Sequence, residues 1–201
     1  MNTAKIKICG LFRPCDADYI NEALPDYAGF VFFQKSHRFV TERRAMLLRA
    51  NMVPSVTTVG VFVNHDPSCI KRLYENRIVS VIQLHGGEDE DYIARLRTLV
   101  PGAEIWKAFK IRSAADLTDA GNSSADRVLL DNGCGTGECF DWSVAANFGS
   151  EMVLAGGLNP ENIRVAIKRF HPFAVDISSG VETEKIKDKA KILAAVAAAR
   201  G

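Results

Sequence analysis

Residues 152–182 read MVLAGGLNPENIRVAIKRFHPFAVDISSGVE, and this stretch decides the fold. It contains two short apolar runs, at 152–155 and 173–177. Neither run alternates with polar residues, which is typical of parallel strands buried on both faces. Between them, Asn159-Pro160 has the form of a helix N-cap followed by proline at the first helical position. The stretch therefore predicts a strand, a helix and a second strand.

The same unit repeats along the rest of the chain. Further apolar runs lie at 6–9, 29–33, 58–63, 79–84, 105–109 and 127–131. Asp66-Pro67 is a second N-cap and proline pair, and Ser113 and Asp141 are further candidate caps. Eight strands that each precede a helix, without a Pro-, Gly- or Ser-rich linker, predict a single (β/α)8 TIM barrel over residues 1–201. An open doubly wound α/β sheet is the alternative, but it commonly uses fewer strands.

Two of the expected helices have a clear apolar face. One face consists of Tyr92, Ile93, Leu96, Leu99 and Val100. The face expected in the last helix consists of Ile186, Ala190, Leu193, Val196 and Ala197.

Composition excludes several classes of protein. The 25 Lys and Arg residues nearly cancel the 24 Asp and Glu residues, so we expect no nucleic-acid partner, and an anionic substrate must be held by local groups. No apolar run approaches the ~20 residues that span a bilayer, and the first residues lack a signal-peptide layout. Five scattered cysteines without CxxC spacing argue against a disulfide framework and a zinc site. We therefore expect a cytoplasmic protein without a metal.

In such a barrel, the residues that follow the strands carry the chemistry. Cys9 ends the first strand and is either a base or a small buried apolar residue. Arg38 is suited to binding a carboxylate through two hydrogen bonds, or is a solvated loop cation. His85 either touches the substrate or is a structural group. Asp131 follows three apolar residues, where desolvation favours general-acid work, although capping a turn is the competing role.

Three glycine-bearing turns follow the last three strands. Glycine allows main-chain N–H groups to converge on an anion without a Cβ in the way. The turns after the seventh and eighth strands lie where these barrels usually bind phosphate. The candidate phosphate-binding residues are Gly135, Thr136, Gly156, Gly157, Ser179 and Gly180.

Taken in order, these segments resemble the phosphoribosylanthranilate isomerase family over essentially the whole chain. The motifs that carry the resemblance are KICG at 7–10, GFVF at 29–32, VGVFVN at 59–64, QLHG at 83–86, LD at 130–131, GTG at 135–137, GGLNPEN at 156–162 and VDISSGVE at 175–182. The ordered set is far more specific than any one motif.

The resemblance implies an aldose–ketose isomerase of tryptophan biosynthesis that uses no metal and no nucleotide. Its reaction is the Amadori rearrangement of N-(5'-phosphoribosyl)anthranilate, a small sugar phosphate. By the same resemblance Cys9 is the general base and Asp131 the general acid, while Arg38 takes the anthranilate carboxylate. His85 and Asp176 are further substrate contacts. Monomer and homodimer are both compatible with the sequence.

Some residues depart from the family pattern. They are Leu11-Phe12-Arg13 after the first motif, Cys134 and Glu138 in the loop after the sixth strand, and the missing glycine before Lys187-Asp188. Two alternatives share the phosphate turns. One is a related barrel enzyme, such as an indole-glycerol-phosphate synthase or a pentose-phosphate epimerase. The other is a phosphate-binding barrel without activity, against which the presence of both Cys9 and Asp131 argues.

Overall fold

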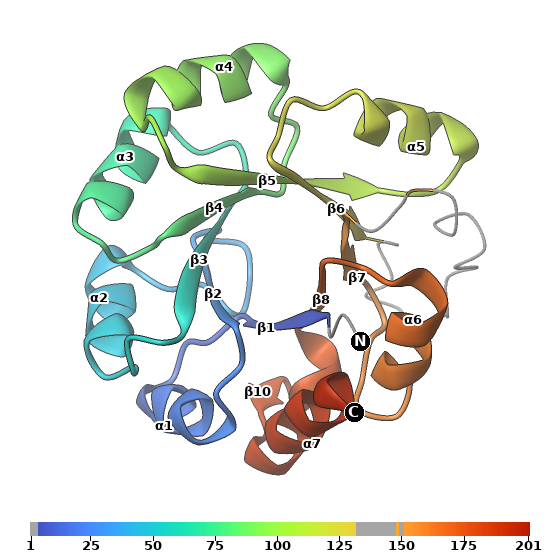
Figure 1. Ribbon diagram of the computed structural model, residues 1–201. Coiled ribbons are helices and arrows are strands. Elements are labelled where there is room, and N and C mark those ends of the chain that lie inside the picture. The colour runs from blue at the N-terminus through green and yellow to red at the C-terminus, as the bar shows by residue number, and fades with distance from the viewer. Residues whose placement is uncertain (1–3, 132–147, 149–150) are drawn as a thin grey trace.

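Eight parallel strands close into a barrel in the computed structural model, which describes residues 4–131, 148 and 151–201 (Figure 1). Each strand pairs with the next, and the last pairs with the first. The strands are β1 (Lys5–Cys9), β2 (Tyr27–Val31), β3 (Thr57–Phe62), β4 (Val81–Leu84), β5 (Glu104–Lys110), β6 (Arg127–Asp131), β7 (Val153–Ala155) and β8 (Ala174–Ile177). The predicted (β/α)8 TIM barrel is confirmed, and each strand limit lies within two residues of its prediction.

Helices surround the barrel (Figure 1). They are α1 (Pro14–Ala23), α2 (Glu42–Ala50), α3 (Pro67–Glu75), α4 (Glu90–Leu99), α5 (Ala114–Gly121), α6 (Ile163–Phe170) and α7 (Lys189–Arg200). After β8 come the short 3-10 helix η2 (Ser179–Val181) and the hairpin of β9 (Glu182–Thr183) and β10 (Ile186–Lys187). None of the helices in the described part of the chain is long and apolar enough to cross a membrane.

The predicted N-caps of α3 and α5 are confirmed. Asp66 accepts a hydrogen bond from the backbone N–H of Ser68, with Pro67 following it, and Ser113 accepts one from Asp116. In α4 the predicted apolar face is also confirmed, because Ile93, Leu96 and Val100 are buried. The predicted cap Asp141 lies outside the described residues.

Two helix predictions were wrong. The helix expected to begin at Pro160 begins at Ile163, because Asn159 instead caps a single turn by accepting hydrogen bonds from the N–H groups of Glu161 and Asn162. The apolar face predicted for the last helix is also wrong except at Val196, because the β9–β10 hairpin occupies the chain up to Lys187 and leaves Ile186 41% exposed. The face of α7 that is buried consists of Ile192, Ala195, Val196 and Ala199.

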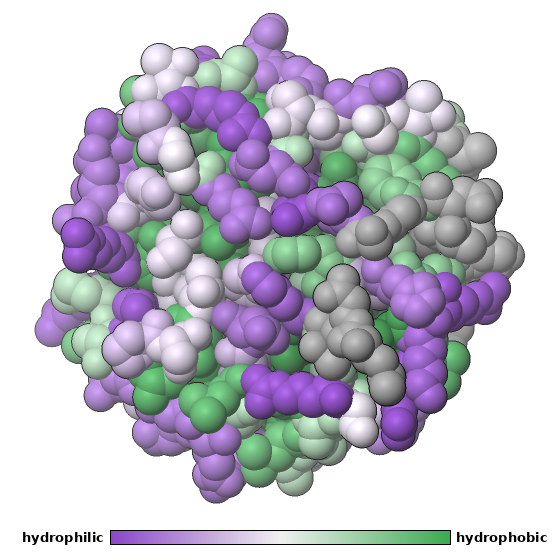
Figure 2. Space-filling view, in the orientation of Figure 1, coloured by the Kyte–Doolittle hydropathy of each residue, from purple (hydrophilic) through white to green (hydrophobic). Residues whose placement is uncertain are grey.

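Two apolar cores hold the barrel together. The larger lies between the strands and the helices, where the second face of every strand is covered. The smaller fills the N-terminal half of the barrel interior and includes Tyr27, Val59, Val81, Trp106, Leu129, Val153 and Ala174. Buried polar side chains, Lys7, Gln83 and Asp176 among them, take their place towards the carboxyl ends of the strands. Figure 2 shows hydrophilic side chains over much of the outer surface, with apolar ones between them.

Two aspartates at the N-terminal end of the barrel each join a pair of neighbouring strands. Asp26, just before β2, accepts a 2.9 Å hydrogen bond from the N–H of Ile6 in β1. Asp126, just before β6, accepts a 2.7 Å bond from the N–H of Ile105 in β5. Each aspartate therefore fixes the alignment of a strand pair at its N-terminal end.

Candidate active site

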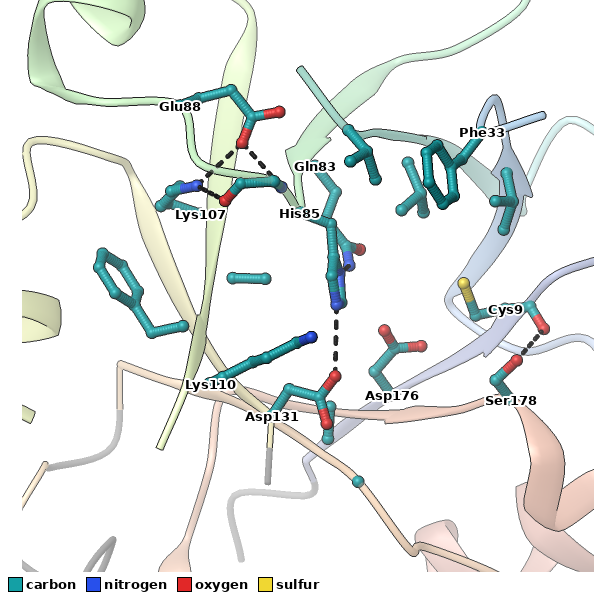
Figure 3. Close-up of a pocket in the computed structure, with 18 of the residues that line it drawn as sticks. Cys9, Phe33, Gln83, His85, Glu88, Lys107, Lys110, Asp131, Asp176 and Ser178 are labelled. Carbon is teal, nitrogen blue, oxygen red and sulfur yellow. Dashed lines mark hydrogen bonds and ion pairs between the residues drawn. The ribbon is translucent and has the colours of Figure 1, made fainter. Parts of the chain in front are cut away.

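A cavity of about 1220 Å³ opens at the carboxyl ends of the strands. Every strand contributes to its wall: Cys9, Val31, Val61, Gln83, Ala108, Asp131, Ala155 and Asp176. Arg38, His85, Gly156, Gly157 and Ser179 also line it. Figure 3 shows the functional ends of Cys9, Asp131 and Asp176 pointing into this one space. The structure thus brings together most of the residues that the sequence singled out, from segments far apart in the chain.

Cys9 lies at the end of β1, on the face that points into the barrel, and is 7% exposed. Burial raises the pKa of its thiol, whereas the ammonium group of the neighbouring Lys7 lowers it. The backbone carbonyl of Cys9 accepts a 3.2 Å hydrogen bond from Ser178 Oγ, which ties β1 to the turn after β8 (Figure 3). The thiol therefore lies at the cavity wall, on a strand end that is tied to the neighbouring turn.

Asp131 ends β6 and lies against His85, with His85 Nε2 3.3 Å from Asp131 Oδ2 (Figure 3). His85 Nδ1 is 3.1 Å from the side-chain amide nitrogen of Gln83. When that amide donates to Nδ1, the imidazole carries its hydrogen on Nε2 and donates it to the carboxylate. Gln83, His85 and Asp131 thus form a chain of polar contacts from the barrel interior to its mouth.

Arg38 lies on the loop after β2, where its guanidinium group is paired with Glu182 through two hydrogen bonds of 2.6 and 2.7 Å. Lys187 Nζ donates to the same carboxylate at 2.7 Å. Burial alone would raise the pKa of Glu182, but Arg38 and Lys187 hold it at about 2. Gly10, with a φ of 82°, makes room for this arginine, since a Cβ there would overlap Arg38 Cδ. Contact between Arg38 and a substrate carboxylate stays a prediction.

The glycine turns after β7 and β8 lie against each other. Gly156 and Gly157 have φ values of 90° and 64°, in the left-handed region that favours glycine. Gly180 does not itself line the cavity, but a Cβ on it would overlap the backbone carbonyl of Leu158. The two turns are therefore a single packed unit. Of the predicted phosphate residues, Gly135 and Thr136 lie outside the described part of the chain, as do Cys134 and Glu138.

Sequence reasoning missed several polar residues of this site. Lys7 is fully buried, and its Nζ lies 2.7 Å from Asp176 Oδ2. Lys107 and Glu88 form another buried ion pair at the cavity wall, with 2.9 Å between Nζ and Oε2 (Figure 3). Alternation along β1 could have identified Lys7, because residues two apart in a strand share a face. Within the described residues, no group of three or more His, Cys, Asp or Glu side chains could hold a metal ion.

Comparison with known proteins gives one consistent family. The family model for N-(5'-phosphoribosyl)anthranilate (PRA) isomerase matches residues 6–198. The chain is 41% identical over 191 residues to the N-(5'-phosphoribosyl)anthranilate isomerase of Clostridium kluyveri, with 94% of each chain covered. It is also similar to the crystal structure of phosphoribosyl anthranilate isomerase from Thermotoga maritima, with a TM-score of 0.89, 35% identity and 98% of each chain covered.

A second solved structure adds a ligand. The chain is 34% identical, with a TM-score of 0.86 and 98% of each chain covered, to a phosphoribosyl anthranilate isomerase in complex with reduced 1-(o-carboxyphenylamino)-1-deoxyribulose 5-phosphate.

Proposed function

Because the chain belongs to the N-(5'-phosphoribosyl)anthranilate isomerase family, we propose that it catalyses the Amadori rearrangement of N-(5'-phosphoribosyl)anthranilate in tryptophan biosynthesis. The product is 1-(2-carboxyphenylamino)-1-deoxyribulose 5-phosphate. The observation that carries the proposal is that Cys9 and Asp131 line one cavity, beside a turn unit suited to a phosphate group. The ligand of a relative supports the same proposal, since that protein binds a reduced form of this product.

The first step is opening of the furanose ring. Asp131 donates a proton to the ring oxygen, the bond from C1 to that oxygen breaks, and the nitrogen lone pair forms an iminium ion. His85 donates a hydrogen bond to the carboxylate that is left. This hydrogen bond stabilises the negative charge that forms on the carboxylate as the proton leaves.

The second step is removal of the hydrogen on C2 of the sugar. The iminium group withdraws electrons and acidifies this hydrogen, so the thiolate of Cys9 is basic enough to take it. The resulting enolamine gains a proton at C1 from the Cys9 thiol and loses one from its C2 hydroxyl to the carboxylate of Asp131, which gives the ketone and restores both residues. The protons exchanged with Asp131 and Cys9 therefore cancel and no electrons are gained or lost, and so we propose that no metal or cofactor takes part.

The remaining residues position the substrate. Arg38 is placed to take the anthranilate carboxylate at the mouth of the cavity. Asp176 Oδ1 is buried without a hydrogen-bond partner among the described residues, so it can accept a bond from a sugar hydroxyl. The turns that contain Gly156, Gly157 and Ser179 hold the phosphate.

A fluorescence assay tests the proposal. The substrate is generated in situ from anthranilate, and its emission is followed after addition of protein. Cys9→Ala and Asp131→Asn should each lower turnover by about 10²- to 10⁴-fold, which is the usual contribution of a positioned acid or base.

The matched controls are Cys69→Ala on α3 and Asp18→Asn on α1, which do not line the cavity and should leave turnover unchanged. Chelation should also have no effect. No acceleration by micromolar protein would refute the proposal, and full turnover in either site variant would refute the assigned roles.

A further inference from the structure

A lysine in the barrel interior has no role in the chemistry proposed above. Lys7 lies on β1 two residues before Cys9, so both side chains are on the face that points into the barrel. Lys7 is fully buried, and its Nζ lies 2.7 Å from Asp176 Oδ2 on β8. Burial lowers the pKa of Lys7, but Asp176 and Cys9 together raise it above its ordinary value. Lys7 is therefore a buried ammonium ion.

Gly29 on the neighbouring strand β2 shows how close Lys7 and Cys9 come to each other. A Cβ placed on Gly29 would lie 2.8 Å from Cys9 Sγ and 3.2 Å from Lys7 Cε. The sulfur and the end of the lysine side chain thus flank the same small space, which is open only because residue 29 has no Cβ. Asp176 holds the ammonium group from the other side.

We propose that Lys7 is a positioning residue for Cys9: held by Asp176, its ammonium group pairs with the thiolate that Cys9 forms before it takes the substrate proton. The catalytic meaning of this pair rests on the proposed function. The ion pair itself does not, because it follows from the contacts inside the barrel.

Four charged groups act on the sulfur of Cys9. They are Lys7, Asp176, Lys187 and Arg38, and they differ in how far a neighbouring charge opposes them. Lys187 and Arg38 share the carboxylate of Glu182, at 2.7 and 2.6 Å, so their charges are already opposed there. Lys7 is opposed by Asp176, which acts on the sulfur in the reverse sense and less strongly than the ammonium group does. Of the two charges of this pair, the cation therefore has the larger effect on the sulfur.

A structural role alone does not account for this pair. Taking two charges out of water is unfavourable, and apolar residues of similar volume often serve stability equally well. The interior of this barrel is apolar in its N-terminal half, so an apolar side chain at position 7 would extend that core. A cation close to a thiol instead favours the thiolate, and a nearby opposite charge typically shifts a pKa by about one to three units.

The test is the pH dependence of Cys9 alkylation by iodoacetamide, measured by mass spectrometry of the peptide that contains Cys9. Only the thiolate reacts, so the midpoint of the rate profile reports ionisation of this sulfur. Lys7→Met should raise the midpoint by about one unit or more. Asp176→Asn should lower it, because the opposing carboxylate is lost.

The matched control is Lys107→Met, which removes another buried ammonium group from the cavity wall and leaves Glu88 without its partner. Its midpoint should equal that of the unmodified chain. Should Lys7→Met fail to fold, the double variant Lys7→Met/Asp176→Asn removes both charges of the pair. This variant should still show a raised midpoint, since the cation has the larger effect.

An unchanged midpoint in Lys7→Met, or in the double variant when the single one does not fold, overturns the proposal. An equal rise in Lys7→Met and Asp176→Asn also overturns it, because that pattern indicates a loosened site. In the isomerase assay, Lys7→Met should shift the rise of kcat/KM with pH to higher pH by the same amount as the alkylation midpoint. The alkylation result does not need turnover, so it stands even when the proposed reaction fails.

Discussion

Glu182 holds Arg38 through two hydrogen bonds at the mouth of the barrel, with 2.6 Å between Nε and Oε1 and 2.7 Å between Nη2 and Oε2. The two residues are 144 positions apart in the chain, and the loop after β2 meets the start of β9 only because the barrel is closed. Arg38 Nη1 takes no part in this pair. The carboxylate therefore orients a guanidinium group that lines the cavity and whose Nη1 is not used by this pair.

The first prediction is that Glu182 acts on substrate affinity through Arg38. Glu182→Gln removes one charge of the pair, so Arg38 loses its fixed orientation and KM should rise about tenfold, equivalent to ~1.4 kcal/mol, with a smaller change in kcat. Steady-state kinetics measures both constants. Glu184→Gln, in the exposed hairpin turn, is the control, and an unchanged KM for Glu182→Gln would refute the orienting role.

The second prediction concerns stability and pH. The pKa of Glu182 is lowered to about 2, so its ionised form stabilises the fold above the ordinary value of 4.5, and this contribution is lost as the pH falls towards 2. At pH 7, Glu182→Gln should lower the free energy of unfolding by on the order of 3 kcal/mol. Denaturant unfolding at pH 7 and pH 3 measures the difference. The free energies of unfolding of the variant and the unmodified chain should lie closer together at pH 3 than at pH 7, and an equal gap at both pH values would contradict the prediction.

The third prediction is that Gly29 cannot be replaced without displacing Cys9. In Gly29→Ala, the new Cβ would lie 2.8 Å from Cys9 Sγ, closer than such atoms approach, and only 3.0 Å from Cys9 Cα. Turnover should fall by at least about tenfold, since a small displacement of a reacting group is costly, and stability by roughly 1–3 kcal/mol. Gly121→Ala at the exposed end of α5 is the control and should keep full turnover.

The fourth prediction tests the packed unit of the turns after β7 and β8. Gly180→Ala would force a Cβ into the backbone carbonyl of Leu158, and backbone cannot move aside as a flexible side chain can. The two turns should separate, and the inhibition constant of inorganic phosphate should rise by about tenfold or more, because convergent N–H groups are lost. Gly87→Ala, where the nearest atom is at 3.7 Å, should leave that constant unchanged.

The residues at strand ends could be predicted because local sequence determines them. Three apolar residues before Asp131 fix both the end of β6 and the position of its carboxylate. Lys7 was missed as a site residue although it lies inside the predicted strand 6–9, where its spacing to Cys9 places both on one face. The Arg38–Glu182 pair could not be predicted, since only the closed barrel joins the two segments. The face of α7 was misplaced because nothing local marks the β9–β10 hairpin before it.

The two aspartates at the foot of the barrel bear on the reaction at its opposite end. Asp26 fastens the strand that carries Cys9, and Asp126 fastens the strand beside the one that carries Asp131. A slip of one residue in either pair would turn the sulfur or the carboxyl group from the cavity towards the helices. Cys9 and Asp131 thus keep their facing directions through bonds made at the far rim by side chains that lie outside the cavity.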